Sequence, residues 1–141
     1  MCNKIKLFDC VAILLSVMLS FLFFAGYAMA GAPEKVDCQA EIEWDLTSEV
    51  SITNFGCKTG EHKKDPALIF TAELKNVSDK PLRYRINIFL LDMDKAAGHL
   101  VPRKGKPPVV EPGKSETVTI PFIKTSELSK KILVIVKTMG L

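Results

Sequence analysis

Apolar and polar residues alternate in short segments beyond residue 37. The first segment, Cys38–Leu46, carries four polar side chains on one face. The other face is apolar and consists of Cys38, Ala40, Ile42, Trp44 and Leu46. A period of two with a clean polar side predicts a half-buried strand.

A second, shorter strand is predicted at Val50–Phe55. Val50 and Ile52 fall on one face, whereas Phe55 and Cys57 fall on the other. If all four side chains point inward, the strand needs a β-bulge near Asn54 or Gly56, since one extra residue restores the alternation.

Similar patterns extend along the rest of the chain. They predict strands at 67–76, 82–90, 99–101, 117–122 and 132–136. The predicted connections are a polar loop at 59–66, turns at 76–81, 92–98 and 111–114, a basic loop at 103–108 and a short helical turn at 125–131. About seven strands with regular turn signals predict an all-β domain, an immunoglobulin-like β-sandwich. The Cys and Trp spacing of antibody domains is absent.

Three segments carry a resemblance to a known family. They are Glu73–Pro81, with its Asn-Val-Ser-Asp turn, Ile86–Asp92, a long strand ending in Asp, and Glu111–Glu116, with its Pro-Gly turn. Together they resemble the FxLYD-type group of bacterial extracytoplasmic immunoglobulin-like domains. The sequence departs from that group at Leu91, where the family has Tyr before Asp. The resemblance implies a fold and an envelope location, and no chemistry.

The first thirty residues have the three parts of a secretory signal. Lys4 and Lys6 precede the apolar stretch 11–24, and Ala28 and Ala30 form an A-x-A site. We therefore predict a signal peptide at 1–30, a flexible leader at 31–37 and one sandwich domain at 38–141. The alternative is an uncleaved anchor, because the stretch 11–30 is long enough to span a bilayer. Both interpretations place the domain outside the cytoplasm, in the periplasm or the medium.

The charge of the predicted mature chain is nearly balanced. Residues 31–141 carry 17 Lys and Arg against 15 Asp and Glu. Nucleic-acid-binding domains usually present a strong basic face, so the composition argues against a nucleic-acid partner. Contact with a membrane is expected only if the N-terminal segment is retained.

Cys38 and Cys57 are the cysteines that remain after the predicted cleavage. In an oxidising compartment an even number of cysteines favours a disulfide between them. The alternatives are two free thiols, or a metal site that adds His62 and His99. Because the spacing does not match that of structural zinc sites, we predict neither a metal nor a cofactor.

No catalytic motif occurs in the mature chain, and we predict that it is not an enzyme. The best candidate for binding is the basic loop with Arg103, Lys104 and Lys106, which would attract an anionic partner. Alternatively, the basic loop is an ordinary solvated loop tip with no role in binding. The carboxylates of Glu41, Glu43 and Asp45 form a row that a solvated strand face explains.

These features favour a non-catalytic exported binding or assembly module of the bacterial cell envelope, with a protein partner. One alternative is a membrane-anchored accessory subunit of a larger envelope complex. A second alternative is a small metal-handling protein that uses the two cysteines and the two histidines.

Overall fold

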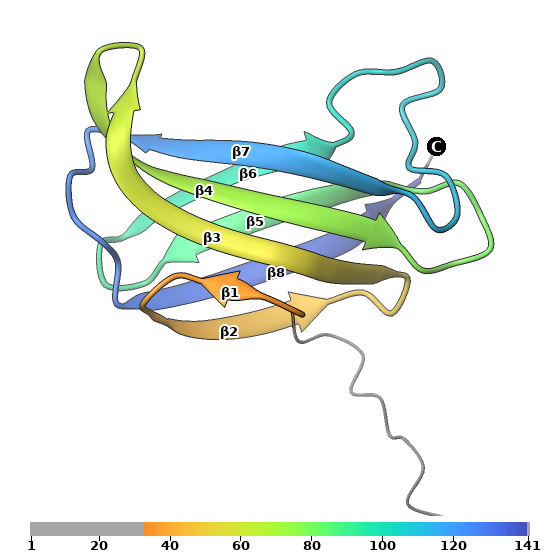
Figure 1. The fold of residues 1–141 in the computed structure, drawn as a ribbon, viewed down its shortest axis with the longest axis horizontal. Coiled ribbons are helices and arrows are strands. Elements are labelled where there is room, and N and C mark those ends of the chain that lie inside the picture. The colour runs from red at the N-terminus through yellow and green to blue at the C-terminus, as the bar shows by residue number, and fades with distance from the viewer. Residues whose placement is uncertain (1–32, 141) are drawn as a thin grey trace, which may run out of the picture.

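A computed structural model describes residues 33–140; the predicted signal peptide and Leu141 lie outside this range. The described chain contains eight strands and no helix. The strands form two four-stranded sheets that pack face to face (Figure 1). The predicted all-β sandwich is confirmed.

The first sheet has the order β1-β3-β4-β7, and the second has the order β2-β8-β5-β6. Their bounds are β1 Val36–Asp37, β2 Glu41–Leu46, β3 Val50–His62, β4 Asp65–Asn76, β5 Arg83–Leu90, β6 Lys95–Val101, β7 Ser115–Ile123 and β8 Lys131–Met139.

Most neighbouring strands are antiparallel. Hairpins join β3 to β4 and β5 to β6, while β7 pairs with β4 and β8 pairs with β5. The N-terminal chain differs, because β1 runs parallel to β3 and β2 runs parallel to β8. It therefore supplies one edge strand to each sheet. The opposite lateral edge is formed by β6 and β7, at the upper side of Figure 1.

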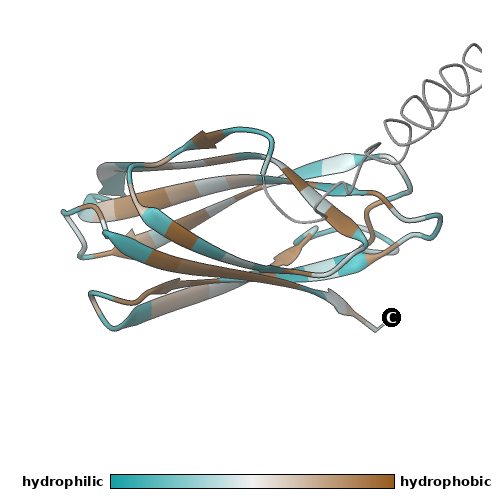
Figure 2. Cartoon of the chain, turned by 90° about the horizontal axis from the view of Figure 1, so that it is seen from below, coloured by the Kyte–Doolittle hydropathy of each residue, from teal (hydrophilic) through white to brown (hydrophobic). Residues whose placement is uncertain are grey.

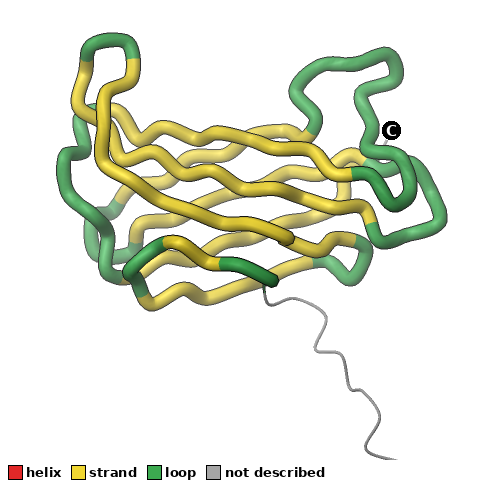
Figure 3. The backbone as a smooth tube through the Cα atoms, viewed as in Figure 1, coloured by secondary structure: helices red, strands yellow, loops and turns green. Residues whose placement is uncertain are grey.

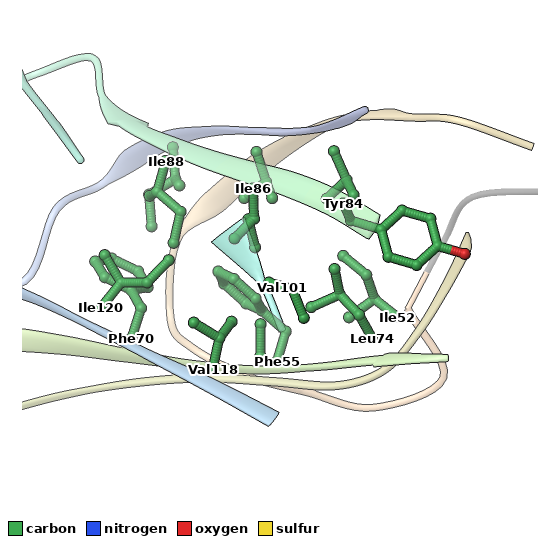
Figure 4. Packing of buried hydrophobic residues seen from close by; sticks show 14 of the residues in the cluster. Ile52, Phe55, Phe70, Leu74, Tyr84, Ile86, Ile88, Val101, Val118 and Ile120 are labelled. Atoms are coloured by element: carbon green, nitrogen blue, oxygen red, sulfur yellow. The ribbon is translucent and has the colours of Figure 1, made fainter. Parts of the chain in front are cut away.

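The core lies between the sheets and follows the alternation of the strands, which Figure 2 displays as brown and teal segments. In Figure 4, Tyr84, Ile86 and Ile88 of β5 point toward side chains of the first sheet. Four aromatic rings form a chain across the core: Trp44, Phe55, Phe70 and Phe122, with successive centroids 5.0, 5.7 and 5.5 Å apart. Offset and edge-on arrangements at these separations are favourable.

The β-bulge that the sequence demanded is present in β3. The pairing register of β3 with β4 shifts between Ile52 and Asn54, so Thr53 is the extra residue. Ile52 and Phe55 are then both buried, and Cys57 packs against the core. The bulge explains how residues of opposite parity share one face of a strand.

Two predicted connections are wrong, because they are strands in the structure. The segment 59–66 extends β3 and β4 into a long hairpin, whose turn residues Lys63 and Lys64 have φ of 53° and 75° (Figure 3). Positive φ at both central residues is the conformation of a type I′ hairpin turn. Likewise, most of the predicted turn 92–98 belongs to β6, which pairs with β5.

The predicted helical turn at 125–131 is also wrong, because this connection is irregular. Ser129 Oγ donates a hydrogen bond to Asp92 Oδ1 at 2.5 Å, and the Lys130 amide donates to Asp92 Oδ2 at 2.8 Å. The bond from Ser129, followed by that from the Lys130 amide, lowers the pKa of Asp92. A carboxylate from the β5–β6 turn therefore fixes the connection that a helix was expected to fill.

Part of the predicted flexible leader is ordered in β1. Its residues Val36 and Asp37 pair with Phe55 and Gly56 of β3. Two further backbone hydrogen bonds, from Glu34 N to Ile52 O and from Phe55 N to Lys35 O, extend the contact.

A basic groove as candidate functional site

The two free strand edges β6 and β7 lie beside each other without pairing, and a groove separates them. One part of it, about 650 Å³, is lined by Leu100–Lys104 and by Glu116–Thr119. A second part, about 410 Å³, is lined by Lys95–Ala97 and by Pro121–Ile123. The groove therefore follows β7 along most of its length.

Two of the three predicted binding residues lie at this groove. Arg103 and Lys104 line its larger part, whereas Lys106 is not among the residues that line it. Arg103 also lines an adjoining hollow of about 320 Å³ with Arg85, Gly98, His99 and Leu100. In the part of the chain that the structure describes, the basic loop therefore forms a wall of a hollow surface.

Arg85 and His99 border the adjoining hollow, although the sequence suggests His99 only as a metal ligand and predicts no binding role for Arg85. Arg85 is exposed on β5, and its register partner on β6 is Leu100. His99, which the sequence placed at the start of a brief strand, lies on β6 opposite Ile86. Recognising that β6 begins at Lys95 would have paired it with β5 and placed Arg85 and His99 on neighbouring strands.

The surroundings of His99 disfavour its protonated form. Partial burial, and then the positive charge of Arg103, lower the pKa of His99 below its ordinary value of 6.5. Both causes disfavour the imidazolium cation. At neutral pH the cations of this region are therefore the arginines and lysines.

Asn76 holds the segment that follows the basic loop. Its side-chain amide donates to Lys80 O at 2.7 Å and to Val110 O at 2.8 Å, and its Oδ1 accepts from the amide and hydroxyl of Ser78 at 2.9 and 2.7 Å. The residue is completely buried. The Asn-Val-Ser sequence is thus a turn that is held by the buried side chain of Asn76.

The hydrogen bonds of β7 show which of its backbone groups face the open edge. Lys124 N donates to Pro66 O at 2.7 Å, and Asn76 N donates to Lys114 O at 2.9 Å. Since hydrogen-bonded pairs alternate along an antiparallel ladder, the even-numbered residues between 114 and 124 bond to β4. The amides and carbonyls of Thr117 and Thr119 therefore face away from the sheet.

The predicted carboxylate row lies far from this groove, on the edge strand β2. Glu41, Glu43 and Asp45 are exposed. Asp45 pairs with Lys137 at 2.5 Å, but both side chains are about half exposed, at 52% and 53%. Exposed pairs contribute little to stability, so the row behaves as a solvated strand face.

Cys38 and Cys57 lie within disulfide distance, and their Cα atoms are 5.0 Å apart. This separation is normal for a disulfide. The pair joins the segment between β1 and β2 to β3. Among residues 33–140, no three His, Cys, Asp or Glu side chains are grouped closely enough to hold a metal ion.

No protein-family model, curated protein or solved structure matches this chain. Within the described range, no helix is long and apolar enough to span a membrane.

Proposed function

We propose that this chain is a non-catalytic, exported module of the bacterial cell envelope that binds a protein partner at the basic groove. The observation that carries the proposal is the open edge between β6 and β7, where two strands with free edges border a groove beside Arg103 and Lys104. Exposed strand edges are common sites of protein association, and basic residues beside them favour an acidic partner.

The export signal and the cysteine pair support the location. Residues 1–30 have the composition of a secretory signal. A disulfide between Cys38 and Cys57 would persist in an oxidising compartment and not in a reducing cytosol. The proposal places both the domain and its partner outside the inner membrane.

A photo-crosslinking residue in place of Thr119 tests the proposal in living cells. Thr119 lies on the open edge of β7, so a partner in the groove would be captured there. We expect a discrete adduct in the envelope fraction. Arg103→Glu/Lys104→Glu should abolish it, because the basic wall then repels an acidic partner.

The matched control carries the same photo-crosslinking residue in place of Glu43, on the outer face of β2 at the opposite lateral edge. The proposal fails if Thr119 yields no adduct, if both positions yield the same adduct, or if the protein is retained in the cytoplasm.

A further inference from the structure

We infer that the groove accepts an extended segment of a partner protein, in which acidic and apolar residues alternate and which adds to β7 as a further strand. This inference rests on the proposed binding function and specifies the kind of partner. Three features of the groove support it: the outward direction of the free backbone groups of β7, the apolar floor and the basic wall.

The free edge of β7 offers a regular row of hydrogen-bonding groups. Ser115, Thr117 and Thr119 belong to the set that does not bond to β4, so each presents an outward amide and carbonyl. Pro121 belongs to the same outward set, and a proline, which has no amide hydrogen, is tolerated there without loss of a ladder bond. An added strand therefore pairs mainly with the part of β7 before Pro121.

The groove beside this edge has an apolar floor. Val101 and Val118 are buried with exposed fractions of 1% and 4%, and they line the larger part together with Leu100 and Pro102. Every second side chain of a strand paired with β7 would point toward this floor, because side chains alternate between the faces of a sheet. The floor therefore selects an apolar residue at alternate positions.

The wall of the groove is basic. Arg85, Lys95, Arg103 and Lys104 line its parts and the adjoining hollow, and Glu116 is the one carboxylate among these lining residues. Lys95 already donates to Lys124 O and Thr125 Oγ1, at 3.2 and 2.7 Å. Acidic side chains between the apolar positions of the segment would be favoured by the remaining cations.

The edge of β7 lacks most of the features that protect exposed edge strands against aggregation. Proteins commonly guard an edge strand with lysines, prolines, bulges or a short length. β7 is nine residues long, carries no Lys or Arg, and is rich in threonine at its outward positions. Pro121 guards one end, while the rest of the edge is suited to pairing.

A short acetylated peptide of alternating Glu and Val, long enough to span β7, is a suitable probe. Fluorescence anisotropy of the labelled peptide measures its affinity for the mature protein. Amide hydrogen exchange measures the strand pairing. We expect binding that weakens with added salt, together with new protection of the Thr117 and Thr119 amides.

Variants separate charge from fold. Arg103→Glu/Lys104→Glu should weaken binding about tenfold, because two attractive contacts become repulsive. The matched control Lys58→Glu/Lys130→Glu changes the net charge equally at exposed positions outside the groove lining and should bind normally. Thr119→Pro removes one outward amide without a change of charge and should also weaken binding. If this variant does not fold, the affinities of the charge variants still test the inference.

Four results would overturn the inference: no binding, equal binding of a Lys–Val peptide, binding without protection of Thr117 and Thr119, or self-association of the protein that Arg103→Glu/Lys104→Glu abolishes. The last result would identify a second copy of this chain as the occupant. If the crosslink at Thr119 persists in cells while the peptide fails, the proposed binding function stands and only this partner chemistry is wrong.

Discussion

The two lateral edges of the sandwich are built in different ways. At one edge the N-terminal chain covers both sheets, since β1 pairs with β3 and β2 pairs with β8. The Cys38–Cys57 pair lies in the same region. At the other edge β6 and β7 belong to different sheets, do not pair with each other and leave a groove between them.

The two edges also differ in charge and burial. The exposed residues of β2 are Glu41, Glu43 and Asp45, whereas the charged residues that line the groove are mainly arginines and lysines. The core-facing residues Ile42, Trp44 and Leu46 of β2 are only half buried. By contrast, Val118, Ile120 and Phe122 of β7 are buried in the core.

The two edges of the sandwich are therefore stabilised in different ways. The N-terminal edge is less deeply buried and is held by pairing with β3 and β8. A disulfide between Cys38 and Cys57, which lie within bonding distance, would add a covalent link to this edge. The edge at β7 is anchored by its own core residues and can remain open without loss of the fold. An edge that is both rigid and open is suited to the addition of a strand, because little order has to be gained on binding.

The largest effect is expected from removal of the cysteine pair. Cys38→Ser/Cys57→Ser should lower the free energy of unfolding by about 3 kcal/mol. The two cysteines are 19 residues apart in sequence, and a link between them restricts the unfolded chain. Urea denaturation of the oxidised and the variant proteins measures the loss. Alkylation before and after reduction shows whether the thiols are bonded in the exported protein.

The same variant also distinguishes the two edges. Amide exchange should accelerate in β2 while β7 keeps its protection, since the core-facing residues of β2 are only half buried whereas those of β7 are fully buried. Equal acceleration in both strands would contradict this contrast, as would an unchanged free energy of unfolding.

The next largest effect is expected at Asn76, which orders the segment behind the groove. Asn76→Ala should lower the free energy of unfolding by about 2 kcal/mol or more, because the carbonyls of Lys80 and Val110 lose their donor. Thermal denaturation measures the change. Ser78→Ala is the control and should cost less, since Asn76 keeps both of its amide donations. Similar losses of stability in the two variants would show that the buried amide of Asn76 stabilises this turn no more than the Ser78 hydroxyl does.

Much of the fold could be predicted because its signals are local. The alternating segments 67–76 and 82–90 closely match β4 and β5. The parity conflict between Ile52 and Phe55 required the bulge that the register shows. Gly113 has a φ of 73°, in keeping with the predicted Pro-Gly turn. In each case neighbouring residues carry the information.

The missed strand segments carry no apolar alternation of their own and become strands through pairing in hairpins. β6 begins Lys-Ala-Ala-Gly-His, which lacks β-branched and large apolar residues, and it forms a strand because it pairs with β5. The polar arm of the β3–β4 hairpin is likewise extended because its two strands pair with each other. The groove brings Leu100–Lys104 to Glu116–Thr119. Only the location of its basic loop was visible from the sequence.

A smaller effect is expected at Gly98, beside the basic wall. A Cβ atom there would lie 2.3 Å from Asn87 Oδ1 and 3.2 Å from Ile86 O. Gly98→Ala should lower the free energy of unfolding by about 1 kcal/mol, because the Asn87 side chain must move away. Asn87 Oδ1 also accepts a hydrogen bond from Arg85 Nε at 3.4 Å, so the change disturbs the wall of the groove.

A double-mutant cycle with Asn87→Ala locates the origin of that strain. Removal of the Asn87 side chain should relieve most of the cost of Gly98→Ala, and chemical denaturation of the four proteins gives the coupling free energy. Strictly additive losses would instead assign the strain to the Ile86 carbonyl.

The smallest effect concerns the pH dependence of the groove. The pKa of His99 is lowered by partial burial and by Arg103, so the unfolded chain binds a proton at this residue more readily than the folded chain does. Stability is therefore full above the ordinary pKa of about 6.5 and declines as the pH falls through the lowered value. The slope should be shallow and should disappear in His99→Asn.

Replacement of Arg103 tests the electrostatic part of this shift. Arg103→Gln should raise the pKa of His99 toward its ordinary value without restoring it fully, since the larger cause, burial, remains. An NMR titration of the imidazole protons measures the change, with Lys58→Gln as a control of equal charge outside the groove. An unchanged pKa in Arg103→Gln would mean that the arginine does not act on the groove in solution. The basic wall would then not select an acidic segment. The open edge of β7 could still pair with an added strand.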